Sequence, residues 1–185
     1  IRKTAELMRK SNSALFEWLG SPIIYEQDDE ISSRLVELRN LYFDPKKSVY
    51  HYLSLAGGIW SKYIAGNPAP VRKKYLYAIR PLACIRFIEK HMCQPPTLFE
   101  SVLNGIEVGG EVRGAIDRLV DDKKQNRELG SGVVDSVLNA WIKSEVEHGE
   151  RLGESLSPVD ITYKELDGLI ADSVLGRRRV IGDLV

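Results

Sequence analysis

The segment VRKKYLYAIRPLACIRFI, residues 71–88, is the clearest helical signal in this 185-residue chain. It follows a proline and consists of good helix formers, with apolar residues on most sides of the axis, so it predicts one largely buried helix. At about 100° per residue, one narrow stripe of that helix carries Lys73, Tyr77, Arg80 and Cys84. A buried cation needs an anionic partner or a path to solvent, so this stripe is the first candidate for a binding site.

Two interpretations of the stripe are open from the sequence. In the first, long cationic side chains of a core helix extend to solvent and bind nothing. In the second, the helix presents Lys73 and Arg80 to phosphate groups. Pro81 removes one backbone hydrogen bond inside the helix and predicts a bend just after Arg80.

Composition excludes a global attraction to nucleic acids or membranes, because 26 basic residues balance 26 acidic ones. Any anion site must come from a local cluster. Cys84 and Cys93 form no metal-type pair, and we expect them to be free thiols in a reducing cytoplasm. The sequence shows neither a signal peptide nor an apolar run of about 18 residues, so no membrane partner is expected. The helical pattern begins at Ile1 without a cap, which predicts further chain upstream.

Apolar spacing and capping residues predict a mainly all-α protein, a helical bundle. At most one short strand is expected, near Ile23–Tyr25. The predicted domains are a helical core over 1–93, a helical C-terminal extension packed on it over 94–176, and a loose tail over 177–185. The clearest helix starts are Asp44 followed by Pro45, and Thr97, which would form a capping box with Glu100. The expected helices cover 1–11, 12–19, 28–41, 44–64, 71–88, 98–103, 111–129, 133–148 and 163–175.

A complete catalytic site is hard to find in these residues. Neighbouring acids such as Asp28 and Asp29 fit the positive end of a helix dipole better than a catalytic pair. No glycine-rich phosphate loop and no nucleophile elbow occurs. Arg86 and His91 have the Arg-x4-His spacing found in helical ribonuclease domains of the HEPN type, and this spacing defines one alternative function.

Five strings carry a family resemblance. Together they resemble the RNA-repair-associated, DNA-polymerase-beta-like family of predicted nucleotidyltransferases (RlaP-like), over roughly residues 1–141. The resemblance implies the helical C-terminal half of such an enzyme. The strings are NSALFEWLGSPIIY (12–25), HYLSLA (51–56), KKYLYAIRPLAC (73–84), PPTLF (95–99) and KQNRELG (124–130).

In that family a Gly-Ser loop and an Asp-x-Asp pair on a mixed sheet come first, and a third carboxylate follows later. The resemblance implies that these acids hold two Mg²⁺ ions. By resemblance, these groups transfer a nucleotidyl group from a nucleoside triphosphate to an acceptor such as RNA. No strand-like segment of this chain carries that pattern. The catalytic carboxylates are therefore expected in a missing N-terminal half, and the fragment alone is expected to be inactive.

The resemblance gives the helical half a nucleotide-binding task. Cations and hydroxyls beside a metal site position a triphosphate. The helix over 71–88 would supply Lys73, Lys74, Tyr77 and Arg80, and Lys47, Ser48 and His51 would line the opposite wall. A base could stack on Tyr25, Tyr52 or Tyr75.

Two further expectations concern the alternative functions and the exposed apolar surface. The second hypothesis for function is a non-catalytic module whose cationic stripe binds phosphates or an acidic partner, and the HEPN-like ribonuclease is the third. If a catalytic half is missing, the helices should expose the apolar surface it covers, and Ile1, Ala5 and Met8 are the residues expected there.

Overall fold

The computed structural model describes residues 2–125, 132–160 and 163–175, and every regular element in these ranges is helical. Ile23–Tyr25 forms no strand but part of an exposed loop, so the all-α class is confirmed and the strand candidate is wrong. The helices are α1 (Arg2–Arg9), α2 (Ser13–Leu19), α3 (Asp29–Tyr42), α4 (Pro45–Ile59), a π-helical turn η1 (Trp60–Ile64), α5 (Arg72–His91), α6 (Phe99–Gly105), α7 (Gly110–Lys124), α8 (Ser136–Ser155) and α9 (Lys164–Leu175).

Side-chain caps begin four of the helices. The carboxylate or amide oxygen of Asn12, Asp28, Asp44 and Asp135 accepts a hydrogen bond from the backbone N–H three residues later, which satisfies a donor left free at a helix start. The capping box predicted at Thr97 does not form. Thr97 Oγ1 instead donates to the backbone oxygen of Glu17 at 2.8 Å, and α6 begins after Leu98.

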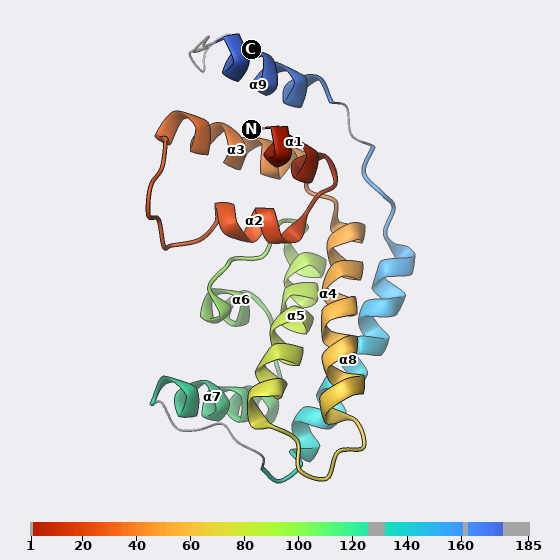
Figure 1. Ribbon diagram of the computed structural model, residues 1–185. Coiled ribbons are helices and arrows are strands. Elements are labelled where there is room, and N and C mark those ends of the chain that lie inside the picture. The colour runs from red at the N-terminus through yellow and green to blue at the C-terminus, as the bar shows by residue number, and fades with distance from the viewer. Residues whose placement is uncertain (1, 126–131, 161–162, 176–185) are drawn as a thin grey trace.

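Three long helices, α4, α5 and α8, run side by side and form the centre of the molecule (Figure 1). α5 runs unbroken through Pro81 and buries most of its apolar side chains. α4 and α5 are antiparallel, since Lys74 lies over Tyr63 and Cys84 lies against Tyr52. α8 approaches α4 closely because Gly149 has no side chain to separate them.

The helices α1, α2, α3 and α9 gather at one end of this central group (Figure 1). Met8 and Ala5 are buried there, so the expectation that they belong to an exposed apolar surface is wrong, while Ile1 lies outside the described residues. Tyr42 of α3 donates a hydrogen bond to Glu165 of α9 at 3.4 Å. The tail expected over 177–185 also lies outside the described residues.

Two more helices, α6 and α7, complete the bundle: α6 packs on α5, and α7 packs on both α5 and α8. Gly105 ends α6 directly on the ring of Phe87, where a Cβ atom would lie 2.5 Å from a ring carbon. Among the helices described, none combines the length and the apolar character needed to cross a lipid bilayer.

Candidate functional site

The seven residues expected to bind a nucleotide fall into three separate places. Lys73, Lys74 and Tyr77 lie together on the surface at the start of α5. Arg80 lies one turn further along α5, half-buried in an ion pair. The remaining three are on α4, near the other end of the central bundle; they are Lys47, Ser48 and His51.

The start of α5 carries the first group as a mixed cationic and aromatic surface. Lys73 Nζ lies 5.5 Å from the centre of the Tyr77 ring, and Lys74 Nζ lies 5.6 Å from it. The Tyr77 side chain is 41% exposed. A hydrogen bond from Lys73, with the charges of Lys73, Lys123 and Lys74 nearby, lowers the pKa of Tyr77. The local potential is therefore positive, although the chain as a whole is neutral.

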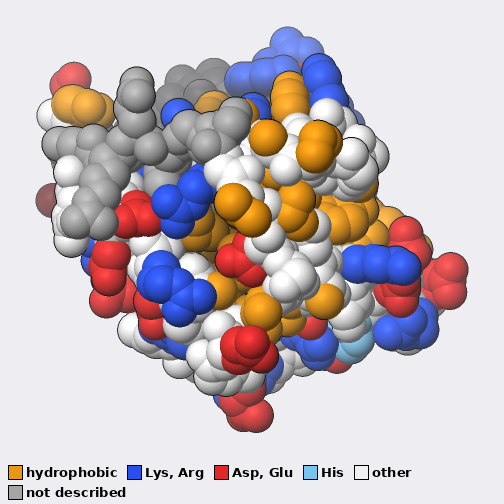
Figure 2. Space-filling view, turned by 90° about the horizontal axis from the view of Figure 1, so that it is seen from below, with side chains coloured by type: hydrophobic (Ala, Val, Ile, Leu, Met, Phe, Trp, Pro, Cys, Tyr) orange, Lys and Arg blue, Asp and Glu red, His pale blue; other side chains and the backbone are white. Residues whose placement is uncertain are grey.

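The π-helical turn η1 adds two residues that the sequence analysis did not single out. Lys74 Nζ lies 4.0 Å from the centre of the Tyr63 ring, and Lys62 Nζ lies 5.2 Å from it. We call Lys62, Tyr63, Lys73, Lys74 and Tyr77 the basic–aromatic surface. Seen from below, at the end of the bundle where α5 begins, Lys and Arg side chains alternate with hydrophobic ones (Figure 2).

The lysines of the basic–aromatic surface have no carboxylate partner among the described residues. Each ion pair found among the described residues joins side chains other than Lys62, Lys73 and Lys74. The neighbouring Asp122 is engaged by Arg72 at 2.8 Å. Three lysines in contact with two tyrosines and without a counter-charge form a surface that an anion can neutralise.

Arg80 connects three segments of the chain. Its Nη1 donates to Glu17 Oε1 at 3.2 Å and its Nη2 donates to the backbone oxygen of Thr97 at 2.8 Å. The Tyr52 hydroxyl donates to the same Glu17 oxygen at 2.9 Å. We call Glu17, Tyr52, Arg80 and Thr97 the Arg80 cluster. About a quarter of the Arg80 and Glu17 side chains remains exposed, 28% and 27% respectively.

The Arg80 cluster unites four of the five strings noted in the sequence. Glu17 comes from 12–25, Tyr52 from 51–56, Arg80 from 73–84 and Thr97 from 95–99. The fifth string, 124–130, lies mostly outside the described residues. Segments far apart in the sequence therefore meet at one polar contact, one helical turn from Tyr77.

The α4 residues do not face the start of α5. Because the helices are antiparallel, Lys47 and His51 lie about 20 Å of helix axis away from Lys73. Ser48 is fully buried, and its hydroxyl has no hydrogen-bond partner among the described residues. Lys47 Nζ lies 3.3 Å from Asp44. These three residues therefore do not form the opposite wall that the sequence analysis expected.

Arg86 and His91 do not meet either. Arg86 donates from Nε and Nη2 to the two carboxylate oxygens of Glu145, at 2.5 and 2.9 Å. These hydrogen bonds, above all, raise the pKa of Arg86. His91 Nε2 instead lies 2.9 Å from the backbone oxygen of Gly105. The described geometry thus offers no ribonuclease pair.

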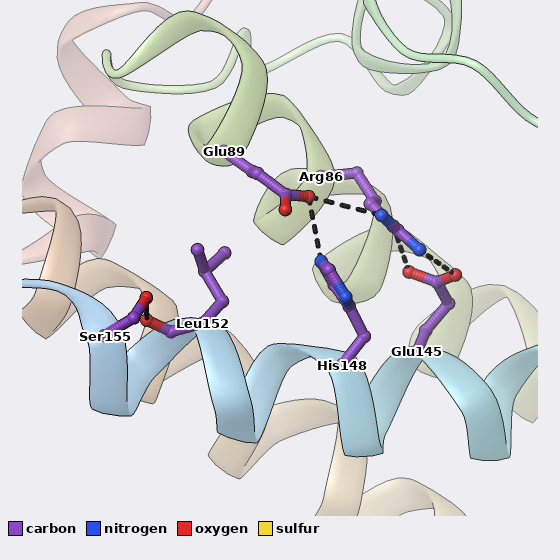
Figure 3. A network of polar contacts seen from close by, with 6 residues as sticks. All are labelled: Arg86, Glu89, Glu145, His148, Leu152 and Ser155. Atoms are coloured by element: carbon purple, nitrogen blue, oxygen red, sulfur yellow. Dashed lines mark hydrogen bonds and ion pairs between the residues drawn. The ribbon is translucent and has the colours of Figure 1, made fainter.

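The contacts of Arg86 belong to a network that joins α5 to α8. Glu89 Oε2 lies 3.2 Å from Arg86 Nη1 and 2.9 Å from His148 Nε2 (Figure 3). Glu145 and His148 project from one side of α8 toward Arg86 and Glu89 on α5. Four titratable side chains are thereby tied to one another, which indicates a structural role between two core helices.

The tyrosines proposed for base stacking differ in their exposure. Tyr52 and Tyr75 are buried, and the Tyr75 hydroxyl donates to Asn139 at 2.8 Å. Tyr25 is 98% exposed, on the loop between α2 and α3. With Trp18 and Ile23 it lines an open hollow of about 640 Å³. Exposed apolar side chains therefore gather at this loop, whereas Ala5 and Met8 of α1 are buried.

The described residues do not form a metal centre. No group of three or more His, Cys, Asp or Glu side chains lies close enough within them to hold an ion. What the arrangement offers is binding chemistry: cations for phosphates and aromatic faces for bases.

Comparison with known proteins confirms the family that the five sequence strings resemble. A family model described as "RlaP: RNA repair pathway DNA polymerase beta family" matches residues 1–172. The chain is 32% identical over 176 residues to the uncharacterized protein YcgL of Bacillus subtilis (strain 168), and the match covers 94% of this chain and 67% of YcgL. No solved structure shows a significant match to the chain.

Proposed function

Because this chain belongs to the RNA repair pathway DNA polymerase beta family, we propose that it is the helical, nucleotide-binding part of a nucleotidyltransferase. The complete protein would transfer a nucleotidyl group from a nucleoside triphosphate to a nucleic-acid acceptor, RNA above all. The observation that carries the proposal is the position of the Arg80 cluster. Four strings of the family resemblance meet in it, about two turns of α5 from Lys73 and Lys74, which lack a counter-charge.

The part of the basic–aromatic surface that lies on α5 supplies the proposed triphosphate contacts. Lys73 and Lys74 are mobile point charges on long side chains, suited to phosphate oxygens. The Tyr77 hydroxyl can donate to a phosphate oxygen, and its exposed ring can also support a base. Lys47, Ser48 and His51 are left out of this site because of their distance and, for Ser48, its burial.

Arg80 has a different part in the proposal. Its guanidinium already donates to Glu17 and Thr97, so its first task is to hold α2, α5 and the segment before α6 in one arrangement. The exposed quarter of its side chain leaves a further N–H edge for a phosphate oxygen. Arg80 therefore holds the surrounding segments in place and forms the boundary of the proposed site on the side of the Arg80 cluster.

The catalytic carboxylates and their Mg²⁺ ions are assigned to a part of the complete protein outside this chain. YcgL offers room for such a part, since about a third of its length has no counterpart in the alignment. The residues described here would bind and orient the nucleotide, and no chemical step is assigned to them.

The test measures nucleotidyl transfer by the full-length protein with Mg²⁺, an RNA acceptor and each of the four labelled nucleoside triphosphates. Lys73→Ala and Lys74→Ala should each raise the KM for the nucleotide about tenfold, because each removes one charge-assisted contact. Lys90→Ala is the matched control, since Lys90 is also an exposed α5 lysine but pairs with Glu107 at the far end of the helix.

Two results would contradict the proposal. If Lys73→Ala and Lys74→Ala both keep the wild-type KM, as the Lys90→Ala control should, the nucleotide is not bound at the start of α5. If the full-length protein transfers none of the four nucleotides but still binds triphosphate through Lys73 and Lys74, the non-catalytic phosphate-binding module is the better description.

A further inference from the structure

The π-helical turn η1 presents two side chains that the proposed nucleotide surface does not use. We propose that Lys62 and Tyr63, together with Lys74, bind the acceptor as a single-stranded nucleic acid next to the nucleotide. An unpaired base would stack on the Tyr63 ring and the adjoining phosphates would contact the two lysines. This inference rests on the proposed function, because it assigns the acceptor side of the same surface.

The backbone geometry places these side chains. α4 ends at Ile59, and the next residues form one π-helical turn, with Ala65 N–H donating to the backbone oxygen of Trp60 at 2.8 Å. A π-turn holds one residue more than an α-turn, so it changes the direction in which later side chains point, and such turns are frequent at functional sites. In this chain the turn brings Tyr63 under Lys74 of α5.

The contacts that the two lysines make with the Tyr63 ring are weak enough for a ligand to replace them. Lys62 and Lys74 are held over the ring by cation–π attraction alone among the described contacts, and both are flexible side chains near solvent. A base that stacks on the ring displaces one lysine from it. That lysine is then free to approach the phosphate of the same nucleotide, so stacking and charge neutralisation act together.

Single-stranded nucleic acid fits this arrangement better than a duplex. A tyrosine ring can stack only on a base whose face is free, and lysines without carboxylate partners follow a flexible phosphate backbone. We therefore expect little sequence preference and strong dependence on salt.

The experiment uses fluorescence anisotropy with a labelled RNA of about ten nucleotides, a length within the usual range for one binding site. Tyr63→Ala should weaken binding about tenfold through loss of stacking, whereas Tyr63→Phe should keep most of the affinity. Lys62→Ala should reduce the slope of log affinity against log salt concentration by about 0.7. A paired hairpin of the same length should bind more weakly than the unpaired single strand.

Matched controls lie at the opposite end of the bundle. Tyr163 is an exposed tyrosine with Arg9 5.5 Å from its ring centre, and Lys90 is an exposed lysine of α5. Tyr163→Ala and Lys90→Ala should leave RNA affinity unchanged. Far-UV circular dichroism checks that Tyr63→Ala folds, and the exposed Lys62 provides a variant that does not depend on packing.

The inference is overturned if Tyr63→Ala and Lys62→Ala bind the single strand as the unchanged protein does, or if the hairpin binds more tightly. Transfer assays separate this result from a failure of the proposed function. Transfer with unchanged RNA affinity in both variants would reject the acceptor site alone. RNA binding that depends on Lys62 and Tyr63, without transfer of any nucleotide, would reject the enzyme and retain the binding site.

Discussion

Removing the Glu145 carboxylate tests the strongest polar contact between α5 and α8. The Glu145 side chain is 7% exposed and accepts two hydrogen bonds from Arg86, whose side chain is 34% exposed. Two charge-assisted hydrogen bonds contribute about 3–6 kcal/mol in a protected site. In Glu145→Ala, Arg86 keeps Glu89 and gains water, which reduces the expected loss of unfolding free energy to about 2–3 kcal/mol.

The assay is urea unfolding followed by far-UV circular dichroism, with a thermal scan that should show Tm falling by about 5–10 °C. Arg86→Ala and the double variant complete a mutant cycle, in which we expect a coupling energy of about 2 kcal/mol. Glu89→Ala should cost less than 1 kcal/mol, or about a third of the Glu145 effect, because its carboxylate is 35% exposed. A loss below about 0.5 kcal/mol in Glu145→Ala, or a coupling energy near zero, would show that this contact does not stabilise the fold.

Three other predictions concern packing and the thiols. Gly105→Ala should destabilise the protein by about 1–3 kcal/mol, because the new Cβ would lie 2.5 and 2.8 Å from two ring carbons of Phe87; a neutral effect in urea unfolding would show that the ring moves aside freely. In the folded protein only Cys93, which is exposed, should react quickly with a thiol reagent at pH 8, because burial raises the pKa of the Cys84 thiol to about 12; two fast-reacting thiols would contradict this. The folded state therefore holds the Cys84 proton more tightly than the unfolded chain does. This contribution to stability is complete below about pH 8.5 and declines by about 1.4 kcal/mol per pH unit as the pH rises toward 12. Cys84→Ala should therefore show a shallower alkaline decline in its urea midpoints, and a slope identical to that of the unchanged protein would contradict the expected burial effect.

The sequence predicted helices best where a side chain marks the start. Asp44 and Pro45 begin α4 as expected, because a carboxylate cap and a fixed proline φ act locally. Thr97 is also a residue type that caps helices, but its hydroxyl donates to the backbone oxygen of Glu17 in α2. This tertiary contact cannot be read from the local sequence. Helix ends were harder to place. The predicted end near His148 falls short of Ser155, because Gly149 and Gly153 suggest a break but actually allow close contact with Leu53 and Tyr50 of α4.

The candidate site was predictable in part for a similar reason. Helical spacing placed Lys73 and Tyr77 on one side of α5, and the structure brings them into contact. The partner of Arg80 could not be inferred, since Glu17 lies 63 residues earlier in the chain. Tyr63 was missed because an ordinary α-helical continuation of α4 gives its side chain a different direction.

The π-helical turn also has a consequence for how related chains can diverge. Deletion of a single residue such as Ser61 would let the turn close as an ordinary α-turn, and the residues that follow would keep their direction about the axis, because a π-turn holds one residue more than an α-turn. The bundle formed before Ile59 would keep its packing, and Tyr63 would still lie under Lys74. A one-residue gap between positions 59 and 65 would then mark homologues that retain this surface on an ordinary helix, whereas a chain that keeps the residue and winds it as an α-turn would rotate Tyr63 by about 100° away from Lys74.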